Sequence, residues 1–220
     1  MEQNTQKIAL VTGASRGLGA AIAEALGAKG WHVLAVARTT GALEELDDRI
    51  RAAGGEGATL APMDVSIPEA MGQLAQAVRQ RWGGLDLWVH AAIHAAPLTP
   101  AGHIDDKDWG KCFAVNMDAT RGLIGMIGPL LQARQGTALF FDDPRGGQPY
   151  FGAYGATKAG QMALARSWQA ESAKLGPRVV IAEPQPMPTA IRGRFFPGEA
   201  RTPLAPCKDE AARILHDMGY

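Results

Sequence analysis

Short apolar segments alternate with longer amphipathic segments along the whole chain. Six segments have the length and residue types of buried strands: residues 7–13, 32–38, 58–64, 85–91, 137–143 and 178–184. Segments with helical spacing lie between them and begin near Leu18, Gly41, Pro68, Asp106 and Gly152. This alternation predicts an α/β fold, a Rossmann-like doubly wound parallel sheet of six or seven strands with helices on both faces.

Turn and cap signals mark several element ends. Ser66 and Glu69 have the spacing of a capping box ahead of the third predicted helix, and Gly83 and Gly84 follow its end. The segment 184–206 is rich in proline, so we expect it to be irregular. It follows the last predicted strand, where α/β sheets bind ligands, and therefore predicts a substrate loop or lid.

Length and charge narrow the classes of protein. The chain has 220 residues, which suits a single domain over 1–220 with residues 1–6 as a flexible N-terminal tail. Lys plus Arg and Asp plus Glu each number 22, so nucleic acid is not an expected partner. Gly13 interrupts the first apolar run, which fits neither a signal peptide nor a membrane span, and we expect a cytoplasmic protein. Cys112 and Cys207 lack metal-site spacing, so no metal is expected.

A glycine-rich turn joins the first predicted strand to the first predicted helix. The stretch VTGASRGLG contains the turn residues Gly13, Ser15, Gly17, Leu18 and Gly19. Its glycines let backbone amides approach a pyrophosphate at a helix N-terminus, where a β-carbon would collide. The turn predicts a dinucleotide site, and the alternative is a tight glycine turn without a ligand. Without a Gly-Lys-Ser/Thr ending, the turn is not a nucleotide-triphosphatase loop.

Four motifs follow one another along the predicted strands and helices. They are TGASRGLG at 12–19, Asp64-Val65 after the third strand, Asn116 in a helix, and Tyr154-x-x-x-Lys158. In this order and spacing the chain resembles the short-chain dehydrogenase/reductase family over nearly its whole length. The resemblance implies an NAD(P)-dependent oxidoreductase that interconverts a small-molecule carbonyl and an alcohol by hydride transfer. It also implies a homodimer or homotetramer.

Two arginines favour NADP(H) over NAD(H). Arg38 follows the second predicted strand, where an NAD-selective site places an acidic residue against the ribose 2′-hydroxyl. Arg16 lies in the glycine-rich turn. Guanidinium groups bind phosphates, so the pair favours a ribose 2′-phosphate. The alternative is two solvated surface arginines.

The resemblance assigns further residues to the cofactor. Asp64, followed by Val65, resembles the residue that contacts the adenine, although an aspartate here could instead order the turn. Ala91 lies in the loop after the fourth strand, beside the expected cofactor. Thr189 resembles the threonine that holds the nicotinamide carboxamide after a Pro-Gly step. Here that step begins with Pro184 but lacks the glycine.

Tyr154 and Lys158 are four residues apart and therefore project from the same face of a helix. A tyrosine with a pKa near ~10 is a poor base at neutral pH, and an adjacent ammonium group favours its phenolate. We therefore expect Tyr154 to act as general acid or base. In the resembling family this lysine also binds the nicotinamide ribose, and an asparagine matching Asn116 supports a proton-relay water. The alternative is an ordinary structural role for each residue.

The serine that normally completes this set is missing. Residues 138–156 contain no serine or threonine, and counting back from Tyr154 without gaps leads to Phe141, with Asp142 next. A neutral Asp142 could donate the lost hydrogen bond, whereas an ionised one would oppose developing negative charge. Other potential donors are His90, His94 and the substrate itself.

Two hypotheses result from this mixture of retained and altered residues. The first is an NADP(H)-dependent oxidoreductase, which the presence of Tyr154, Lys158 and Asn116 favours. The second is a catalytically impaired cofactor-binding protein that serves as a sensor or an assembly partner. The missing serine favours it, as does the sequence HAAI at 90–93, where the family usually has Asn-Asn-Ala-Gly.

Overall fold

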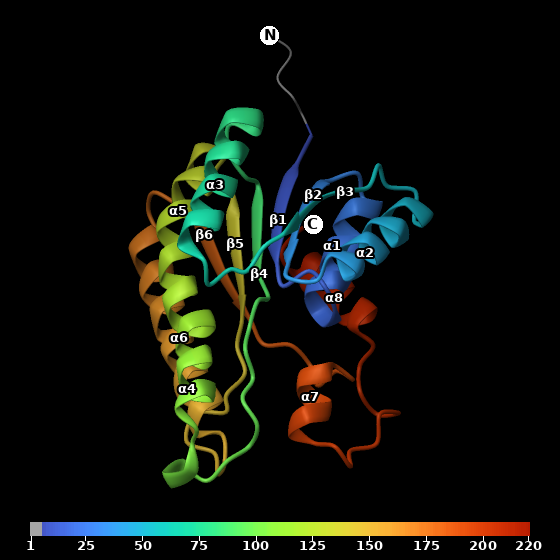
Figure 1. The fold of residues 1–220 in the computed structure, drawn as a ribbon. Coiled ribbons are helices and arrows are strands. Elements are labelled where there is room, and N and C mark those ends of the chain that lie inside the picture. The colour runs from blue at the N-terminus through green and yellow to red at the C-terminus, as the bar shows by residue number, and fades with distance from the viewer. Residues whose placement is uncertain (1–5) are drawn as a thin grey trace.

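The computed structural model describes residues 6–220, so the tail expected at 1–6 lies, apart from Gln6, outside the described residues. One parallel sheet forms the centre of the molecule (Figure 1). Its strands are β1 (Ile8–Thr12), β2 (His32–Ala37), β3 (Ala58–Pro62), β4 (Leu87–His90), β5 (Thr137–Phe141) and β6 (Arg178–Ala182). Their order is β3-β2-β1-β4-β5-β6, which confirms the predicted doubly wound sheet, with six strands among the described residues.

Helices cover both faces of this sheet. They are α1 (Gly17–Ala28), α2 (Thr40–Ala52), α3 (Pro68–Trp82), α4 (Asp106–Cys112), α5 (Ala119–Ala133), α6 (Gly152–Ser172), α7 (Ala190–Phe195) and α8 (Cys207–Asp217). A 3₁₀ turn, η1 (Ala101–His103), precedes α4, and a π-helical turn, η2 (Phe113–Asp118), joins α4 to α5. Helices α1, α2 and α8 lie on one face, and α3, α5 and α6 lie on the other (Figure 1).

The alternation of side chains along β1 explains the two-sided core. Ala9 and Val11 pack towards the α1 face, whereas Ile8 and Leu10 pack towards the α3 and α5 face, and all four are buried. The chain crosses from β1 to β2 on one side and reaches β4 on the other, so the strand order reverses between β1 and β4. Ligands of α/β sheets bind at the carboxyl ends of the strands beside such a reversal.

The predicted capping box is wrong, although the helix it introduces is present. Helix α3 begins at Pro68 after Ile67, and no side chain caps it. Ser66 instead donates from its backbone nitrogen and its hydroxyl to Asp64 Oδ1, at 2.9 and 2.7 Å. The hydrogen bonds of Ser66 to Asp64 thus replace the predicted cap at the start of α3. The predicted glycine stop is confirmed, because Gly83 ends α3 with a φ of 77°.

The proline-rich segment 184–206 is more regular than expected, because it contains α7. Thr189 caps this short helix by accepting a hydrogen bond from the Arg192 nitrogen at 3.2 Å. The Arg192 guanidinium binds both carboxylate oxygens of Glu199, at 2.5 and 2.6 Å. The cap and this bidentate pair order a turn that the proline content alone does not predict.

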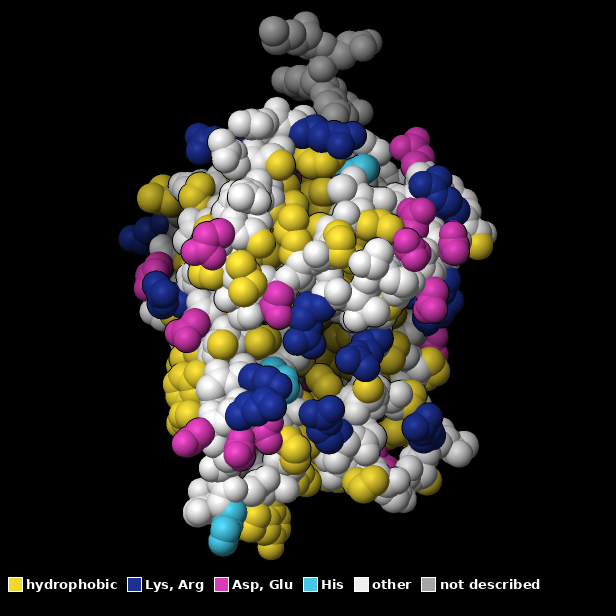
Figure 2. All heavy atoms as spheres, viewed as in Figure 1, with side chains coloured by type: hydrophobic (Ala, Val, Ile, Leu, Met, Phe, Trp, Pro, Cys, Tyr) yellow, Lys and Arg dark blue, Asp and Glu magenta, His cyan; other side chains and the backbone are white. Residues whose placement is uncertain are grey.

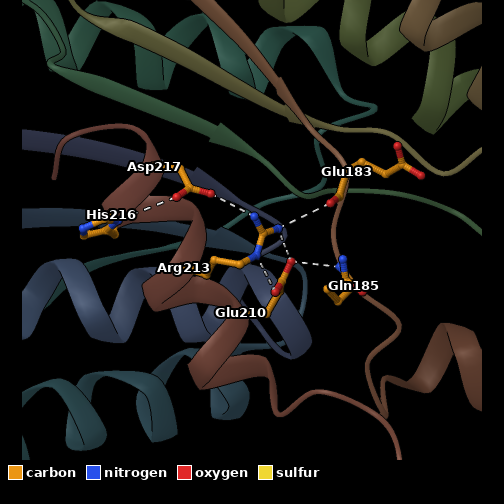
Figure 3. Close-up of polar contacts among 6 residues, drawn as sticks. All are labelled: Glu183, Gln185, Glu210, Arg213, His216 and Asp217. Atoms are coloured by element: carbon orange, nitrogen blue, oxygen red, sulfur yellow. Dashed lines mark hydrogen bonds and ion pairs between the residues drawn. The ribbon is translucent and has the colours of Figure 1, made fainter.

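Helix α8 anchors the start of the same segment (Figure 3). The buried Glu210 carboxylate accepts a hydrogen bond from the Gln185 nitrogen at 2.8 Å and pairs with Arg213 at 2.6 Å. Arg213 also donates to the Glu183 carbonyl at 3.4 Å and pairs with Asp217 at 2.9 Å. These contacts hold the chain in place as it leaves β6. Within residues 6–220, no helix is long and apolar enough to cross a membrane.

Candidate active site

A cleft of about 1330 Å³ opens at the carboxyl ends of the strands, as the strand order predicts. Figure 2 shows it as a hollow surrounded by lysine and arginine side chains. Among the residues that line it are sixteen predicted site residues: Gly13, Ser15, Arg16, Gly17, Leu18, Gly19, Arg38, Asp64, Val65, Ala91, Asp142, Tyr154, Lys158, Pro184, Thr189 and the alternative donor His90. Asn116 lies behind this lining and is fully buried.

Two glycines of the turn between β1 and α1, Gly13 and Gly19, leave no room for a side chain. A β-carbon on Gly13 would lie 2.5 Å from the carbonyl carbon of Ala91, and Gly13 has a φ of +82°. A β-carbon on Gly19 would lie 2.5 Å from the Gly13 oxygen. Gly17 has a φ of +60°, and its β-carbon would lie 3.5 Å from Thr189 Cγ2. The turn is thus packed closely against the β4 loop and approaches the predicted nicotinamide residue.

The predicted arginine pair comes from two strand ends, with Arg16 in the turn after β1 and Arg38 directly after β2. The Arg38 side chain is 67% exposed and stands 3.8 Å from Asp64 Oδ2, a distance that allows only a weak ion pair. The other Asp64 oxygen accepts the hydrogen bonds from Ser66 and so orders this turn. Asp64 therefore has the structural role that the sequence offered as the alternative to an adenine contact. Arg16 immediately precedes α1 with an extended backbone. Both guanidinium groups therefore remain available at the cleft.

The glycine turn, the N-terminus of α1 and the two arginines together fit a nicotinamide dinucleotide. The three turn glycines line the cleft, and a larger residue at Gly13 or Gly19 would collide with backbone. The backbone at the N-terminus of α1 therefore borders the cleft without side chains at these positions, as binding of a pyrophosphate requires. The cleft volume exceeds the range of about 300–1,000 Å³ typical of small-ligand pockets, as a dinucleotide with its substrate requires.

Helix α6 brings Tyr154 and Lys158 to the floor of the cleft, where they are 4% and 6% exposed. The Lys158 ammonium donates to Gln161 Oε1 at 2.8 Å, one turn further along the helix. Burial lowers the pKa of Lys158 to about 8, although the carboxylates of Asp143 and Asp142 oppose that shift. This lysine therefore changes charge close to neutral pH.

The Tyr154 hydroxyl donates to Asp143 Oδ2 at 2.9 Å. The other oxygen of this carboxylate pairs with Arg145 Nε at 2.9 Å. Burial, together with the charge of Asp143 and its hydrogen bond, raises the pKa of Tyr154 well above its ordinary value, while Arg145 acts weakly in the opposite direction. The phenol is thus stabilised in its protonated form.

In the structure Asp142, the predicted donor, binds groups other than Tyr154. Its Oδ2 pairs with Arg166 Nη2 at 2.5 Å, and its Oδ1 accepts a hydrogen bond from the Asp143 nitrogen at 2.8 Å. The residue in contact with Tyr154 is the neighbouring Asp143, which the sequence comparison did not select. The conformation of the loop between β5 and α6 places Asp143, and not Asp142, next to the tyrosine. The paired acidic residues were the only signal for it in the sequence.

Asn116 lies in the π-helical turn η2 and clamps the loop after β4. Its Oδ1 accepts from the His94 nitrogen at 2.8 Å, and its Nδ2 donates to the His94 carbonyl at 2.9 Å. The same amide nitrogen donates to Thr157 Oγ1 on α6 at 2.9 Å. The side chain thus connects the cleft loop to the helix that carries Tyr154.

A chain of buried polar groups leads from β1 to Lys158, and sequence reasoning missed two of its members, Thr120 and Gln161. His90 contacts Thr12 Oγ1 through Nδ1 and Thr120 Oγ1 through Nε2, both at 2.9 Å. Gln161 Nε2 donates to the same Thr120 hydroxyl at 2.9 Å, which leaves its Oε1 for Lys158. Burial, assisted by the charge of Lys158, lowers the pKa of His90 to about 3. His90 is therefore a neutral link in this chain.

Aromatic side chains from α7 and from the start of α6 pack around Tyr154. Phe195 packs against Tyr154 and Phe151, with ring centroids 4.9 Å apart in each pair. Arg194 donates to the carbonyl of Ala95, which connects α7 to the loop after β4. The substrate end of the cleft thus has an apolar wall.

Comparisons with known proteins agree with this architecture. A family model described as short chain dehydrogenase matches residues 7–200. An uncharacterized oxidoreductase of Mycobacterium tuberculosis is 33% identical, over 97% of this chain and 80% of its own. The 3beta-hydroxysteroid dehydrogenase 1 of Eggerthella lenta is 32% identical over the same shares. A short chain dehydrogenase structure from Shigella flexneri, complexed with NADP, superposes with a TM-score of 0.83 at 26% identity, covering 94% of this chain and 90% of its own.

Proposed function

Since the chain belongs to the short-chain dehydrogenase family, we propose that it is an NADP(H)-dependent oxidoreductase that interconverts a carbonyl and an alcohol. The observation that carries this proposal is the buried pair Tyr154 and Lys158, which lines the same cleft as the glycine turn. A bound nicotinamide cofactor would supply or accept the hydride at this place. The NADP complex of the Shigella flexneri relative supports the choice of cofactor.

The cofactor would be held by residues from four segments. The glycine turn with Ser15 and Leu18 would bind the pyrophosphate, since it precedes the N-terminus of α1. Arg16 and Arg38 would bind the 2′-phosphate. Asp64 and Val65 would contact the adenine. The nicotinamide half would meet Ala91, Lys158, Pro184 and Thr189, all of which line the cleft.

Tyr154 would exchange the proton that accompanies hydride transfer. The Asp143 carboxylate raises the cost of forming the phenolate, and the Arg145 guanidinium offsets part of that cost. A Lys158 ammonium, one turn further along α6, would lower the cost as well. Asn116 would contribute by holding the loop after β4 against α6. Proton exchange would thus depend on the balance between the Asp143 carboxylate and the nearby cations.

A second function is favoured by one observation, the hydrogen bond from Tyr154 to Asp143. Losing one donor to a developing oxyanion typically costs ~10²–10³ in rate, and a carboxylate in its place adds repulsion. The second candidate is therefore a cofactor-binding protein with impaired chemistry, which acts as a sensor or an assembly partner.

We also propose a homodimer or homotetramer. Trp109 of α4 and Phe113 of η2 stack with ring centroids 4.8 Å apart and are 40% and 36% exposed. Such an exposed aromatic pair suits an interface between subunits. Light scattering after size-exclusion chromatography measures the assembly, and a monomer at micromolar concentration contradicts it. The cytoplasmic location stays a prediction.

The test begins with fluorescence titration of NADPH and NADH, followed by cofactor oxidation with aldehydes, ketones and quinones. We expect tighter binding of NADPH, because Arg16 and Arg38 favour the additional phosphate. We expect Tyr154→Phe to retain binding and to abolish turnover, because it removes the exchangeable proton. Binding without turnover in the unmodified protein would favour the sensor, and absence of binding would exclude both functions.

A further inference from the structure

The polar partner of Tyr154 is a hydrogen-bond acceptor, whereas reduction of a carbonyl requires a donor. Asp143 Oδ2 accepts from the Tyr154 hydroxyl at 2.9 Å, and Asp143 Oδ1 faces Arg145. The negative end of this ion pair therefore points at the tyrosine. A substrate oxygen within hydrogen-bond distance of Tyr154 would stand beside the carboxylate. As that oxygen gained negative charge, the carboxylate would oppose it.

A protonated carbon–nitrogen double bond reverses this relation. Its nitrogen carries both a positive charge and a hydrogen, so it would donate a charge-assisted hydrogen bond to Asp143 Oδ2. Hydride addition then cancels a charge, whereas addition to a carbonyl creates one. The carboxylate that hinders the oxygen substrate thus favours the nitrogen substrate.

Asp143 is the charged group near Tyr154 that could accept a hydrogen bond from a substrate nitrogen, because the neighbouring cations are bound elsewhere. Arg145 is paired with the far oxygen of Asp143 and also donates to Gln148 Oε1 at 3.2 Å. The Lys158 ammonium donates to Gln161. In the pKa of Tyr154, the raising effect of the Asp143 charge exceeds the lowering effect of Arg145, so the field of this ion pair at the hydroxyl is negative.

The apolar wall of the cleft also tolerates cations. The Arg145 guanidinium lies over the rings of Phe151 and Phe196, 5.5 and 5.4 Å from their centroids. Aromatic faces attract positive charge at such distances. Phe195, next to Tyr154, offers a similar surface to the organic substituents of a substrate. The surroundings of the tyrosine therefore fit a cation with apolar substituents.

We propose that this centre acts on a protonated imine in the reducing direction and on an amine in the oxidising direction, with the nitrogen bound by Asp143. The proposal rests on the cofactor-dependent hydride transfer proposed above. In reduction, the hydride forms a carbon–hydrogen bond, and the π electrons of the C=N bond become the nitrogen lone pair. NADPH is oxidised to NADP⁺ and the iminium charge is cancelled, which gives a neutral amine. The amine then takes up one proton from the solvent and leaves as an ammonium ion.

The kinetic test compares 2-methyl-1-pyrroline with cyclopentanone, which match in the number of heavy atoms, in the NADPH-supplemented full chain. We expect kcat/KM to favour the imine by about tenfold or more, since hydrogen bonds to charged groups contribute about 1.5–3 kcal/mol. Asp143→Asn lowers imine turnover about tenfold to a hundredfold for the same reason. Asp143→Ser raises ketone turnover by about tenfold or more, because it introduces a hydroxyl donor.

Asp142→Asn is the matched control, because it removes the same charge from the neighbouring residue, which pairs with Arg166. We expect it to change the imine-to-ketone ratio by less than about threefold, because the Asp142 carboxylate is bound to Arg166 and not to Tyr154. A ketone preference in the unmodified protein, or an equal change in both variants, overturns the imine proposal and leaves the oxidoreductase proposal intact.

A binding measurement separates the two proposals if neither probe is turned over. Calorimetry follows 2-methylpyrrolidine binding to the protein saturated with NADP⁺, and to the protein alone if NADP⁺ does not bind. We expect Asp143→Asn to weaken binding about tenfold or more, while Asp142→Asn, whose carboxylate is bound to Arg166, weakens it by less than about threefold. That result supports recognition of the amine by Asp143 even where turnover is absent. Equal binding by the unmodified protein and Asp143→Asn, or no binding by either, overturns it.

Discussion

The two ends of the cleft are specified in different ways. At the cofactor end, a glycine turn is shaped by backbone contacts, with Gly13 against Ala91 and Gly19 against the Gly13 oxygen. At the chemical end, the charge next to Tyr154 is decided by side chains, above all by Asp143 and its partner Arg145. A backbone-defined site tolerates few substitutions, whereas a side-chain-defined site can change its chemistry through one residue. This difference explains why the glycine turn keeps the family pattern while the side chains next to Tyr154 depart from it.

The largest effect is expected at the backbone-defined end, from Gly13→Ala. The new β-carbon would lie 2.5 Å from the backbone carbon of Ala91, and the residue would have to keep a φ of +82°. Left-handed strain costs about 1–2 kcal/mol and overpacking about 1–3 kcal/mol, so we expect a loss of about 4 kcal/mol in unfolding free energy. Urea denaturation measures this loss, and NADPH titration should show that binding is lost as well.

Gly30→Ala is the matched control for that variant. Gly30 has nearly the same φ, +81°, but a β-carbon there would meet nothing within 4 Å. Only the strain of about 1–2 kcal/mol should remain, and NADPH binding should be unchanged. If both variants lose the same stability and both bind NADPH, close packing does not define the cofactor end.

The fold could be predicted because its signals are local and repeated. Each of the six apolar segments became a strand, and each helical start agreed within about one residue, since periodicity reports burial directly. The predicted capping box did not form, because the backbone nitrogen and the hydroxyl of Ser66 both donate hydrogen bonds to Asp64, two residues earlier. Helix α7 was missed because its stabilising pair, Arg192 and Glu199, is recognisable only once the turn exists.

The candidate site was predictable only in part. Motif spacing identified Tyr154 and Lys158, which the structure indeed brings to one cleft with the glycine turn. The partner of the tyrosine could not be found by counting, because the conformation of the loop after β5 decides whether Asp142 or Asp143 reaches it. Thr120 and Gln161 were missed because their role depends on side-chain contacts across two helices.

A smaller but still global effect is expected from His90, which lies where the two ends meet. Its pKa is about 3 in the folded chain against 6.5 for an exposed histidine. Below pH 6.5 the unfolded chain binds a proton that the folded chain refuses until about pH 3, so unfolding becomes easier as the pH falls. Between pH 6.5 and 4 this amounts to roughly 3 kcal/mol, at about 1.4 kcal/mol per unit.

His90→Asn tests that expectation, because asparagine retains hydrogen-bonding groups but does not titrate. Urea denaturation between pH 4 and 7 should give a flatter stability profile for this variant than for the unmodified protein. His103→Asn, a substitution at an exposed histidine of η1, should leave the profile unchanged. A profile that is equally steep in all three proteins would show that His90 takes up its proton in the folded state.

The smallest effect is expected where a side chain tunes the chemical end from behind, at Gln161. Because the pKa of Lys158 is about 8, turnover that needs its ammonium should fall as the pH rises through that value. Gln161→Leu removes the acceptor of this ammonium, which disfavours the charged form, so the alkaline limb of kcat should move down by about one pH unit. Gln169→Leu, on the same helix but bound to the Val179 carbonyl, should not move it. An unmoved limb in Gln161→Leu would mean that the buried chain from Thr12 to Lys158 contributes to packing alone, and that the chemical end is set entirely by the residues facing the cleft.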